Sequence, residues 1–173
     1  MSKLLSLDQA SRTTGWAVFD GSELVKFGKF TATEEDIGER LYEIRNHVQN
    51  LIETYGIDEV VFEDIQLQNN VLNNIQTFKI LAEVFGIIDE LLVELKIPHT
   101  AVLASTWKST LGIKGRTRPE QKKNAQIYVN LKYNIKATQD ESDAICIGSH
   151  MRGGKAIAKQ PLKSDDGGCD WSD

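Results

Sequence analysis

Six carboxylates stand at three separated points of the chain, each group at the edge of an apolar segment. They are Asp8, then Glu63 and Asp64, then Asp140, Glu141 and Asp143. Carboxylate oxygens are the ligands that hard divalent cations such as Mg²⁺ prefer, and these ions usually need more than one. The pattern therefore predicts a metal site assembled from three distant parts of the sequence.

The first two acids also have ordinary structural explanations. Asp8 ends an apolar segment, and an isolated Asp there often does no more than bond the following turn, here at Ser11. Glu63 directly follows the apolar run VVF, where an ionised Glu is costly without a partner or a metal ion. The joint pattern favours the metal site, because it is more specific than either acid alone.

The third group of acids lies at the start of a predicted helix. Asp140 and Asp143 are three residues apart, so they share one helix face and gain from the positive end of the helix dipole. Asp140 and Glu141 are also common helix-start residues, so a capping role stays open for both. Asp143 must turn inward beside Ala144 to contribute to a site. Asp64 and Glu141 are interpreted as supporting or surface residues.

Basic residues are segregated along the chain although its net charge is -5. A bound metal would reverse the sign of the acidic group for an approaching phosphate, so the net charge alone does not exclude nucleic acid. A basic run is often only a solvated loop, and its meaning depends on what lies beside it. The segment 108–123 contains one acid, Glu120, and six basic residues: Lys108, Lys114, Arg116, Arg118, Lys122 and Lys123.

The 173 residues, 40% of them hydrophobic, suffice for one compact domain and hardly for two. No apolar stretch approaches the roughly 20 residues of a membrane helix, and the apolar run at the N-terminus is too short for a signal peptide. We therefore expect a soluble, cytoplasmic protein. Cys146 lies in an apolar helical pattern and is predicted to be core. His47, His99 and His150 show no ligand spacing and are interpreted as structural or surface residues.

Hydrophobic periodicity predicts alternating strands and helices. An Asp20-Gly21 turn joins two strands, and Thr33 is the expected cap of the first helix, with Asp36 three residues on. Pro119 suits the first position of a later helix. The predicted strands are 3–9, 14–20, 23–30, 58–65 and 99–104. The predicted helices run from Thr33 to 55, over 71–95, from 105, from 119 after a loop at 112–118, and over 140–151.

This order of elements brings the acids together. Asp8 ends the first predicted strand, Glu63 ends the fourth, and the DESD run begins the last helix. If the first and fourth strands are parallel neighbours, their carboxyl ends meet at the crevice where open α/β sheets bind ligands. A helix that starts there can direct Asp140 and Asp143 at one ion.

Three segments resemble the RuvC family of Holliday-junction resolvases: LSLDQASRTTGWAVFD, VVFEDI and QDESDAICIG. The resemblance covers roughly residues 3–151. It implies an α/β, RNase H-like fold, in which a five-stranded mixed sheet, its first three strands antiparallel, is flanked by helices. It also implies a homodimer that uses Mg²⁺ to cut two strands of a four-way DNA junction symmetrically, leaving 5′-phosphate and 3′-hydroxyl ends.

The resemblance assigns roles to individual residues. Asp8 matches the first family acid, Glu63 the second, and Asp140 and Asp143 the closing pair, so these four are expected to bind two Mg²⁺ ions, for which Mn²⁺ can substitute. The family also uses a lysine near the start of the penultimate helix. Lys122 is the best match, and Lys123 is the alternative.

The basic segment is expected to contact the DNA backbone, because such binding depends largely on phosphate neutralisation by Lys and Arg. Related bacterial enzymes carry an aromatic residue three positions after the second acid, where this chain has Gln66. An amide stacks poorly on bases, so we expect looser sequence selectivity. Core packing is favoured over base stacking for Trp107. The expected DNA-binding residues are Lys108, Lys114, Arg116, Arg118, Lys123 and Gln66.

The predicted helix over residues 71–95 is apolar on more sides than one core contact needs. It is therefore the expected homodimer surface, unless both faces are buried within one copy. We expect a nuclease domain over residues 1–152 and a flexible tail over 153–173, which lacks periodicity.

Two other functions are weighed against a junction nuclease. An actin-like nucleotide phosphotransferase would need Gly-rich phosphate loops and a second, duplicated domain, and neither is visible in this sequence. A noncatalytic module that binds branched DNA would be indicated by a missing acid, and all four are present.

Overall fold

The computed structural model describes residues 1–66 and 71–157. Among these residues, no helix is long and apolar enough to cross a membrane. The strands are β1 (Lys3–Asp8), β2 (Thr13–Asp20), β3 (Glu23–Thr31), β4 (Glu59–Glu63) and β5 (His99–Val102). The helices are α1 (Ile37–Tyr55), α2 (Val71–Glu94), α3 (Ala104–Thr110), α4 (Arg118–Tyr133) and α5 (Gln139–Met151).

The five strands form one mixed sheet in the order β3-β2-β1-β4-β5. β1 pairs antiparallel with β2, and β2 pairs antiparallel with β3. β1 and β4 are parallel, as are β4 and β5, because helices connect them on the way along the chain. The predicted fold, with three antiparallel strands first, is confirmed.

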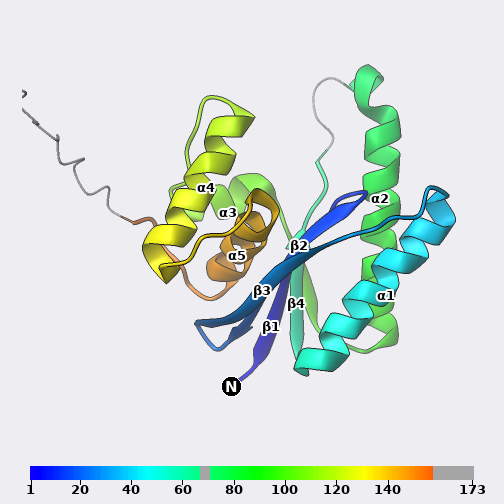
Figure 1. The fold of residues 1–173 in the computed structure, drawn as a ribbon, viewed down its shortest axis with the longest axis horizontal. Coiled ribbons are helices and arrows are strands. Elements are labelled where there is room, and N and C mark those ends of the chain that lie inside the picture. Colours follow the sequence, from blue (N-terminus) through cyan, green and yellow to red (C-terminus); the bar gives the residue numbers. More distant parts are fainter. Residues whose placement is uncertain (67–70, 158–173) are drawn as a thin grey trace, which may run out of the picture.

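Helices cover both faces of this sheet, α1 and α2 on one side and α3, α4 and α5 on the other (Figure 1). Side chains alternate along a strand, so β1 supplies both cores. Leu5 and Leu7 pack in the cluster that includes residues of α1 and α2, whereas Leu4 packs with residues of α4 and α5. The strand β1 is therefore buried on both sides, as its apolar sequence predicts.

The helix α5 lies very close to the centre of the sheet. The Ser6 hydroxyl on β1 donates to the carbonyl of Ala144 at 2.7 Å. A Cβ at Gly148 would stand 2.2 Å from a ring carbon of Phe19, so only glycine fits there. This contact holds α5, and with it the carboxylates at its start, at a fixed distance from β1 and β2.

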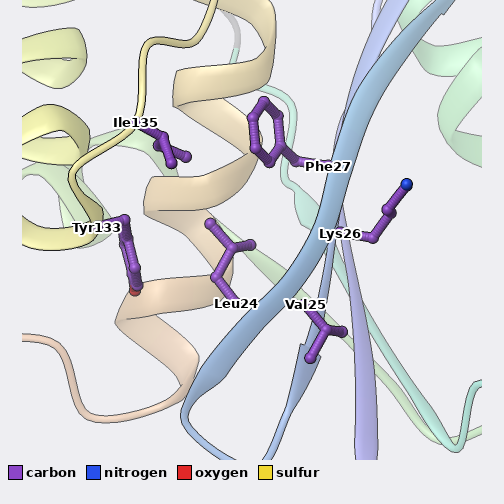
Figure 2. A pocket seen from close by; sticks show the side chains of 6 residues that line it. All are labelled: Leu24, Val25, Lys26, Phe27, Tyr133 and Ile135. Carbon is purple, nitrogen blue, oxygen red and sulfur yellow. The ribbon is translucent and has the colours of Figure 1, made fainter.

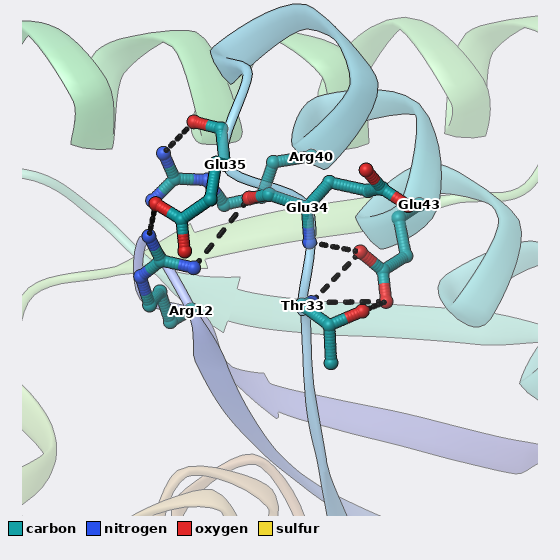
Figure 3. A network of polar contacts seen from close by, with 6 residues as sticks. All are labelled: Arg12, Thr33, Glu34, Glu35, Arg40 and Glu43. Carbon is teal, nitrogen blue, oxygen red and sulfur yellow. Dashed lines mark hydrogen bonds and ion pairs between the residues drawn. The ribbon is translucent and has the colours of Figure 1, made fainter.

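The cap of α1 differs from the prediction. Asp36, not Thr33, is the N-cap residue, and its carboxylate accepts from the amide of Glu39 at 3.1 Å. The Glu43 carboxylate from α1 instead accepts from the amides of Thr33 and Glu34, which keeps this linker outside the helix (Figure 3). These bonds lower the pKa of Glu43. The expected capping position was therefore wrong by three residues.

A hollow of about 340 Å³ lies between the edge strand β3 and the end of α4 (Figure 2). Leu24 and Phe27 on β3 line it, with Tyr133 and Ile135 opposite. None of the six carboxylates lines this hollow, so it is not the predicted metal site.

After α5 the chain packs back against the end of that helix and against the loop that follows α3. The amide of Gly154 donates to the Ser149 carbonyl at 2.7 Å, and a Cβ at Gly112 would meet Ala156 at 2.7 Å. Residues 158–173 lie outside the described residues. The division into a domain over 1–152 and a flexible tail over 153–173 stays a prediction.

Candidate active site

The first two acids are neighbours at the carboxyl ends of parallel strands. Leu7 on β1 is in register with Phe62 on β4, so the next residues, Asp8 and Glu63, end adjacent strands side by side. The side chain of Gln9 holds this pair of strand ends together. It donates to the Glu63 carbonyl at 2.6 Å and accepts from the Glu63 amide at 3.2 Å.

The third group of acids reaches the same place through α5. Thr138 caps this helix, and a capping box joins it to Glu141, which explains Glu141 as a structural residue. Asp8 is opposite Gly15 on β2. A Cβ on Gly15 would stand 1.9 Å from the carbonyl oxygen of Asp140, so α5 begins directly against Gly15 and close to Asp8.

The charges of these acids act on one another. Burial raises the pKa of Asp8 well above its ordinary value, and the negative charges of Asp143 and Glu63 raise it further. Burial also raises the pKa of Asp143, although Lys122 opposes that shift, and it raises the pKa of Glu63. A site that crowds carboxylates in this way favours binding of a cation.

Two hydrogen-bond donors pair with the clustered acids. The Lys122 ammonium lies 3.2 Å from Asp143 Oδ2, and the Trp107 indole nitrogen lies 3.0 Å from Glu63 Oε2. Lys123, the other candidate lysine, is exposed. Within residues 1–66 and 71–157, no three His, Cys, Asp or Glu side chains form a ready-made metal-binding group.

Several interpretations of single residues agree with the structure. Trp107 is 1% exposed and packs in the core, and Cys146 is buried. The His47 ring stacks on Phe30, and the ring of His99 is hydrogen-bonded to the carboxylate of Asp89. The carboxylate of Asp64 accepts from the next amide, that of Ile65, at 2.9 Å.

Sequence reasoning missed two residues that support Glu63. The sequence around Trp107 indicates core packing or base stacking, and it does not indicate a partner for the indole N–H. Gln9 belongs to none of the patterns that point to the site. The available signal was its type, because an amide directly after a strand-ending acid can bond both backbone groups of a neighbouring strand.

Four of the expected DNA-binding residues lie around the start of α4, whereas Lys108 is on α3 and Gln66 follows β4. Lys114, Arg116, Arg118 and Lys123 are exposed, and none of them has a salt bridge within the described parts of the chain. A hollow of about 520 Å³ lies beside them. Its polar and basic lining side chains include Gln66, Lys108, Lys114 and Gln121.

A family model described as crossover junction endodeoxyribonuclease RuvC matches residues 4–150. The chain belongs to the RuvC family. RuvC of Xanthobacter autotrophicus is 27% identical over 168 residues, covering 92% of this chain and 96% of its own. RuvC of Ehrlichia chaffeensis is 26% identical over 151 residues, with 84% and 92% covered.

Solved RuvC-like structures share the fold. RuvC of T. thermophilus in complex with Holliday junction substrate has a TM-score of 0.62 at 15% identity, covering 91% of this chain and 100% of that one. The Fowlpox virus resolvase with its Holliday junction DNA has a TM-score of 0.57 at 14% identity, with 87% and 96% covered. Through the family match, this chain is a crossover junction endodeoxyribonuclease of the RuvC family by distant homology.

Proposed function

We propose that this protein resolves Holliday junctions and other branched DNA by paired, Mg²⁺-dependent hydrolysis that leaves 5′-phosphate and 3′-hydroxyl ends. One observation carries the proposal. Asp8, Glu63 and the start of α5 with Asp140 and Asp143 meet at one end of the sheet, and Lys122 lies against Asp143. Chain segments far apart in the sequence thus bring four acids and one ammonium group together.

The donor set suits the metal that the family implies. Asp8, Glu63, Asp140 and Asp143 offer only carboxylate oxygens, and their mutual repulsion would be relieved by a divalent cation. We propose that these four residues hold two Mg²⁺ ions, or Mn²⁺ in their place. When bound, these ions polarise the phosphodiester and lower the pKa of the attacking water.

The protein's own residues then orient and neutralise the substrate. Lys122 is half-buried beside Asp143, where its ammonium can donate to a non-bridging phosphate oxygen as negative charge develops. The exposed basic residues near the start of α4 contact flanking phosphates, which sets the register of the DNA without reading its sequence.

Lys122→Met is expected to lower the rate of junction cleavage by about 10²- to 10³-fold, because a positioned cation is lost from the developing charge. Lys123→Met is the matched control, since it removes the same group from the exposed neighbouring position. Single-turnover cleavage at saturating protein measures both. Equal losses in the two variants, or the larger loss at Lys123, would reverse the assignment.

Gln66 lines the hollow that also contains Lys108 and Lys114, next to the strand that ends in Glu63. An amide can bond many base edges but gives little stacking energy. We therefore propose that sequence selectivity is relaxed in this enzyme. A strong preference for a single tetranucleotide among junctions of varied core sequence would contradict this.

The function is tested with a labelled synthetic four-way junction, beside a fork and a linear duplex, each with Mg²⁺ or EDTA. We expect symmetric, paired nicks in the junction that require the metal ion and are absent in linear duplex. Ligation of the products without further treatment would show the 5′-phosphate and 3′-hydroxyl ends. Tight junction binding without cleavage would instead indicate a noncatalytic module.

Paired cuts need two active sites, and we propose a homodimer through α2. Its inner side is buried at Val84, Ile88 and Leu91, whereas Ile75 and Val93 are 50% and 64% exposed. Exposed apolar side chains on a helix already anchored to the sheet are available for a second copy. Sedimentation analysis of the full chain measures the oligomeric state.

A further inference from the structure

Trp107 has the largest fully buried side chain among the described residues, yet one edge of it is polar. It lies on the short helix α3, directly after the strand β5 that borders β4. Its indole N–H donates to Glu63 Oε2 at 3.0 Å. A position that needs only packing has no use for a buried N–H, which requires a partner to offset its desolvation. Here the partner is one of the acids.

The backbone and the side chain of Glu63 are held separately. Gln9 bonds both backbone groups of Glu63, which fixes the strand end. Three rotatable side-chain bonds remain between this strand end and the carboxylate. Within the described residues, the Trp107 indole is the side-chain group that hydrogen-bonds the Glu63 carboxylate.

Contacts continue from Trp107 to the basic loop. The Lys108 ammonium lies 5.3 Å from the centroid of the Trp107 ring and donates to Gln121 Oε1 at 3.1 Å. The Gln121 amide in turn donates to the carbonyl of Gly115 at 3.1 Å. Glu63 is thus linked through side chains to the loop that carries Lys114 and Arg116.

We infer that Trp107 is a positioning residue for Glu63, an inference that rests on the proposed role of Glu63 in binding the metal ion. The indole holds Oε2, so Oε1 is presented to the ion in one orientation. Partners of metal ligands typically affect metal affinity or activity by 10- to 100-fold. Trp107 therefore tunes the metal requirement of the enzyme without touching metal or DNA.

Trp107→Phe tests the inference, because phenylalanine keeps an aromatic ring but removes the N–H. We expect the Mg²⁺ concentration for half-maximal junction cleavage to rise about 10- to 100-fold, with the rate near wild type once Mg²⁺ is saturating. Calorimetric titration of Mn²⁺ into the DNA-free protein should show the same loss of affinity. Junction binding in EDTA should be unchanged.

Trp16→Phe is the matched control. Trp16 is partly buried and packs on Tyr55 at 5.8 Å between ring centroids, against the core on the opposite face of the sheet. Trp16→Phe should leave the Mg²⁺ dependence of junction cleavage unchanged. Thermal unfolding of both variants measures the packing that each substitution removes. Poor packing alone would lower cleavage equally at every Mg²⁺ concentration, whereas lost positioning would lower it chiefly at low Mg²⁺.

A second measurement keeps Trp107 in place. The double variant Trp16→Phe/Trp171→Phe leaves one tryptophan in the chain. Added Mn²⁺ should change its fluorescence, and Glu63→Gln in the same background should remove that change.

Two different failures can be told apart. If Glu63→Gln abolishes cleavage but Trp107→Phe keeps the wild-type Mg²⁺ dependence and Mn²⁺ affinity, the positioning role is wrong. If Glu63→Gln cleaves normally, the proposed metal site itself is wrong.

Discussion

Asp8→Asn is expected to reduce junction cleavage by about 10³-fold or more while raising the thermal stability of the metal-free protein. Asp8 ends the central strand β1, next to Glu63 and close to the start of α5, so it can contact an ion together with either group. Its amide replacement keeps the shape but lacks the charge that binds a cation. Single-turnover cleavage and junction binding, measured on the same preparation, should show cutting lost and binding kept.

The gain in stability follows from the direction of the pKa shift. Burial and the charges of Asp143 and Glu63 raise the pKa of Asp8 in the folded protein. A group with a raised folded pKa contributes stability below its unfolded pKa, and this contribution is lost as the pH rises through the folded pKa. Asparagine imitates the neutral form at every pH. The stability of Asp8→Asn relative to the wild type should therefore increase as the pH rises above the ordinary pKa range of Asp.

Thermal melts in EDTA across that pH range measure this difference. A chain of this length shifts its melting temperature by about 2–4 °C for each kcal/mol. Added Mg²⁺ should stabilise the wild type and have little effect on the variant. Asp64→Asn is the control, because the Asp64 carboxylate accepts from the amide of Ile65 and pairs with none of the clustered acids or Lys122 within the described residues. This variant should keep both cleavage and the wild-type pH response. A wild type more stable than Asp8→Asn in EDTA at neutral pH would contradict the crowded-acid interpretation.

Gly15→Ala is expected to lower cleavage by about 10²-fold through a single added methyl group. That Cβ would stand 1.9 Å from the carbonyl oxygen of Asp140 and 2.4 Å from its carbon, far inside contact distance. Both atoms belong to the backbone of α5, and Gly148 already sets that helix tightly against Phe19. The start of α5 must therefore move away from Asp8, and displacements of about 1 Å at an active site cost about this much.

The same change should destabilise the fold by about 1–3 kcal/mol, the usual effect of overpacking a core. Gly86→Ala is the control for stability only, because Gly86 lies on α2, the helix proposed to form the dimer. Apart from its chain neighbours and nearby helix backbone, an added Cβ there meets no described atom within 4 Å, and alanine favours a helix by about 1 kcal/mol. Chemical denaturation and Mg²⁺-saturated cleavage measure both effects. Wild-type cleavage by Gly15→Ala would show that the position of α5 against β2 does not matter for the reaction.

The strands and helices were predictable because one local rule governs each of them. The continuous burial of β1 from Leu4 to Leu7 and the VVF run of β4 are direct consequences of a sheet covered on both faces. The cap of α1 was not predictable in this way. Thr33 and Asp36 are both good capping residues. Which of them caps α1 depends on Glu43, ten residues after Thr33, because its carboxylate accepts a hydrogen bond from the Thr33 amide.

The acids at the carboxyl ends of strands were also predictable, because parallel strands bring such ends together. The support of Glu63 was not, since the bonds from Gln9 and Trp107 cross between strands and helices over 54 and 44 residues. The contact of Gly15 with Asp140 likewise joins two segments that no local pattern relates. Sequence reasoning finds residues whose chemistry is unusual, and it overlooks ordinary residues that hold them.

The parallel pairing of β1 with β4, and the late position of α5, have a consequence for a protein made from its N-terminus onward. Asp8 leaves the ribosome early, Glu63 follows only after the hairpin and α1, and Asp143 comes near the end of the fold. A shortened product that ends before residue 138 holds half of the acids and lacks α5, which packs on β1 and β2. The proposed set of four acids is therefore incomplete until α5 has been synthesised.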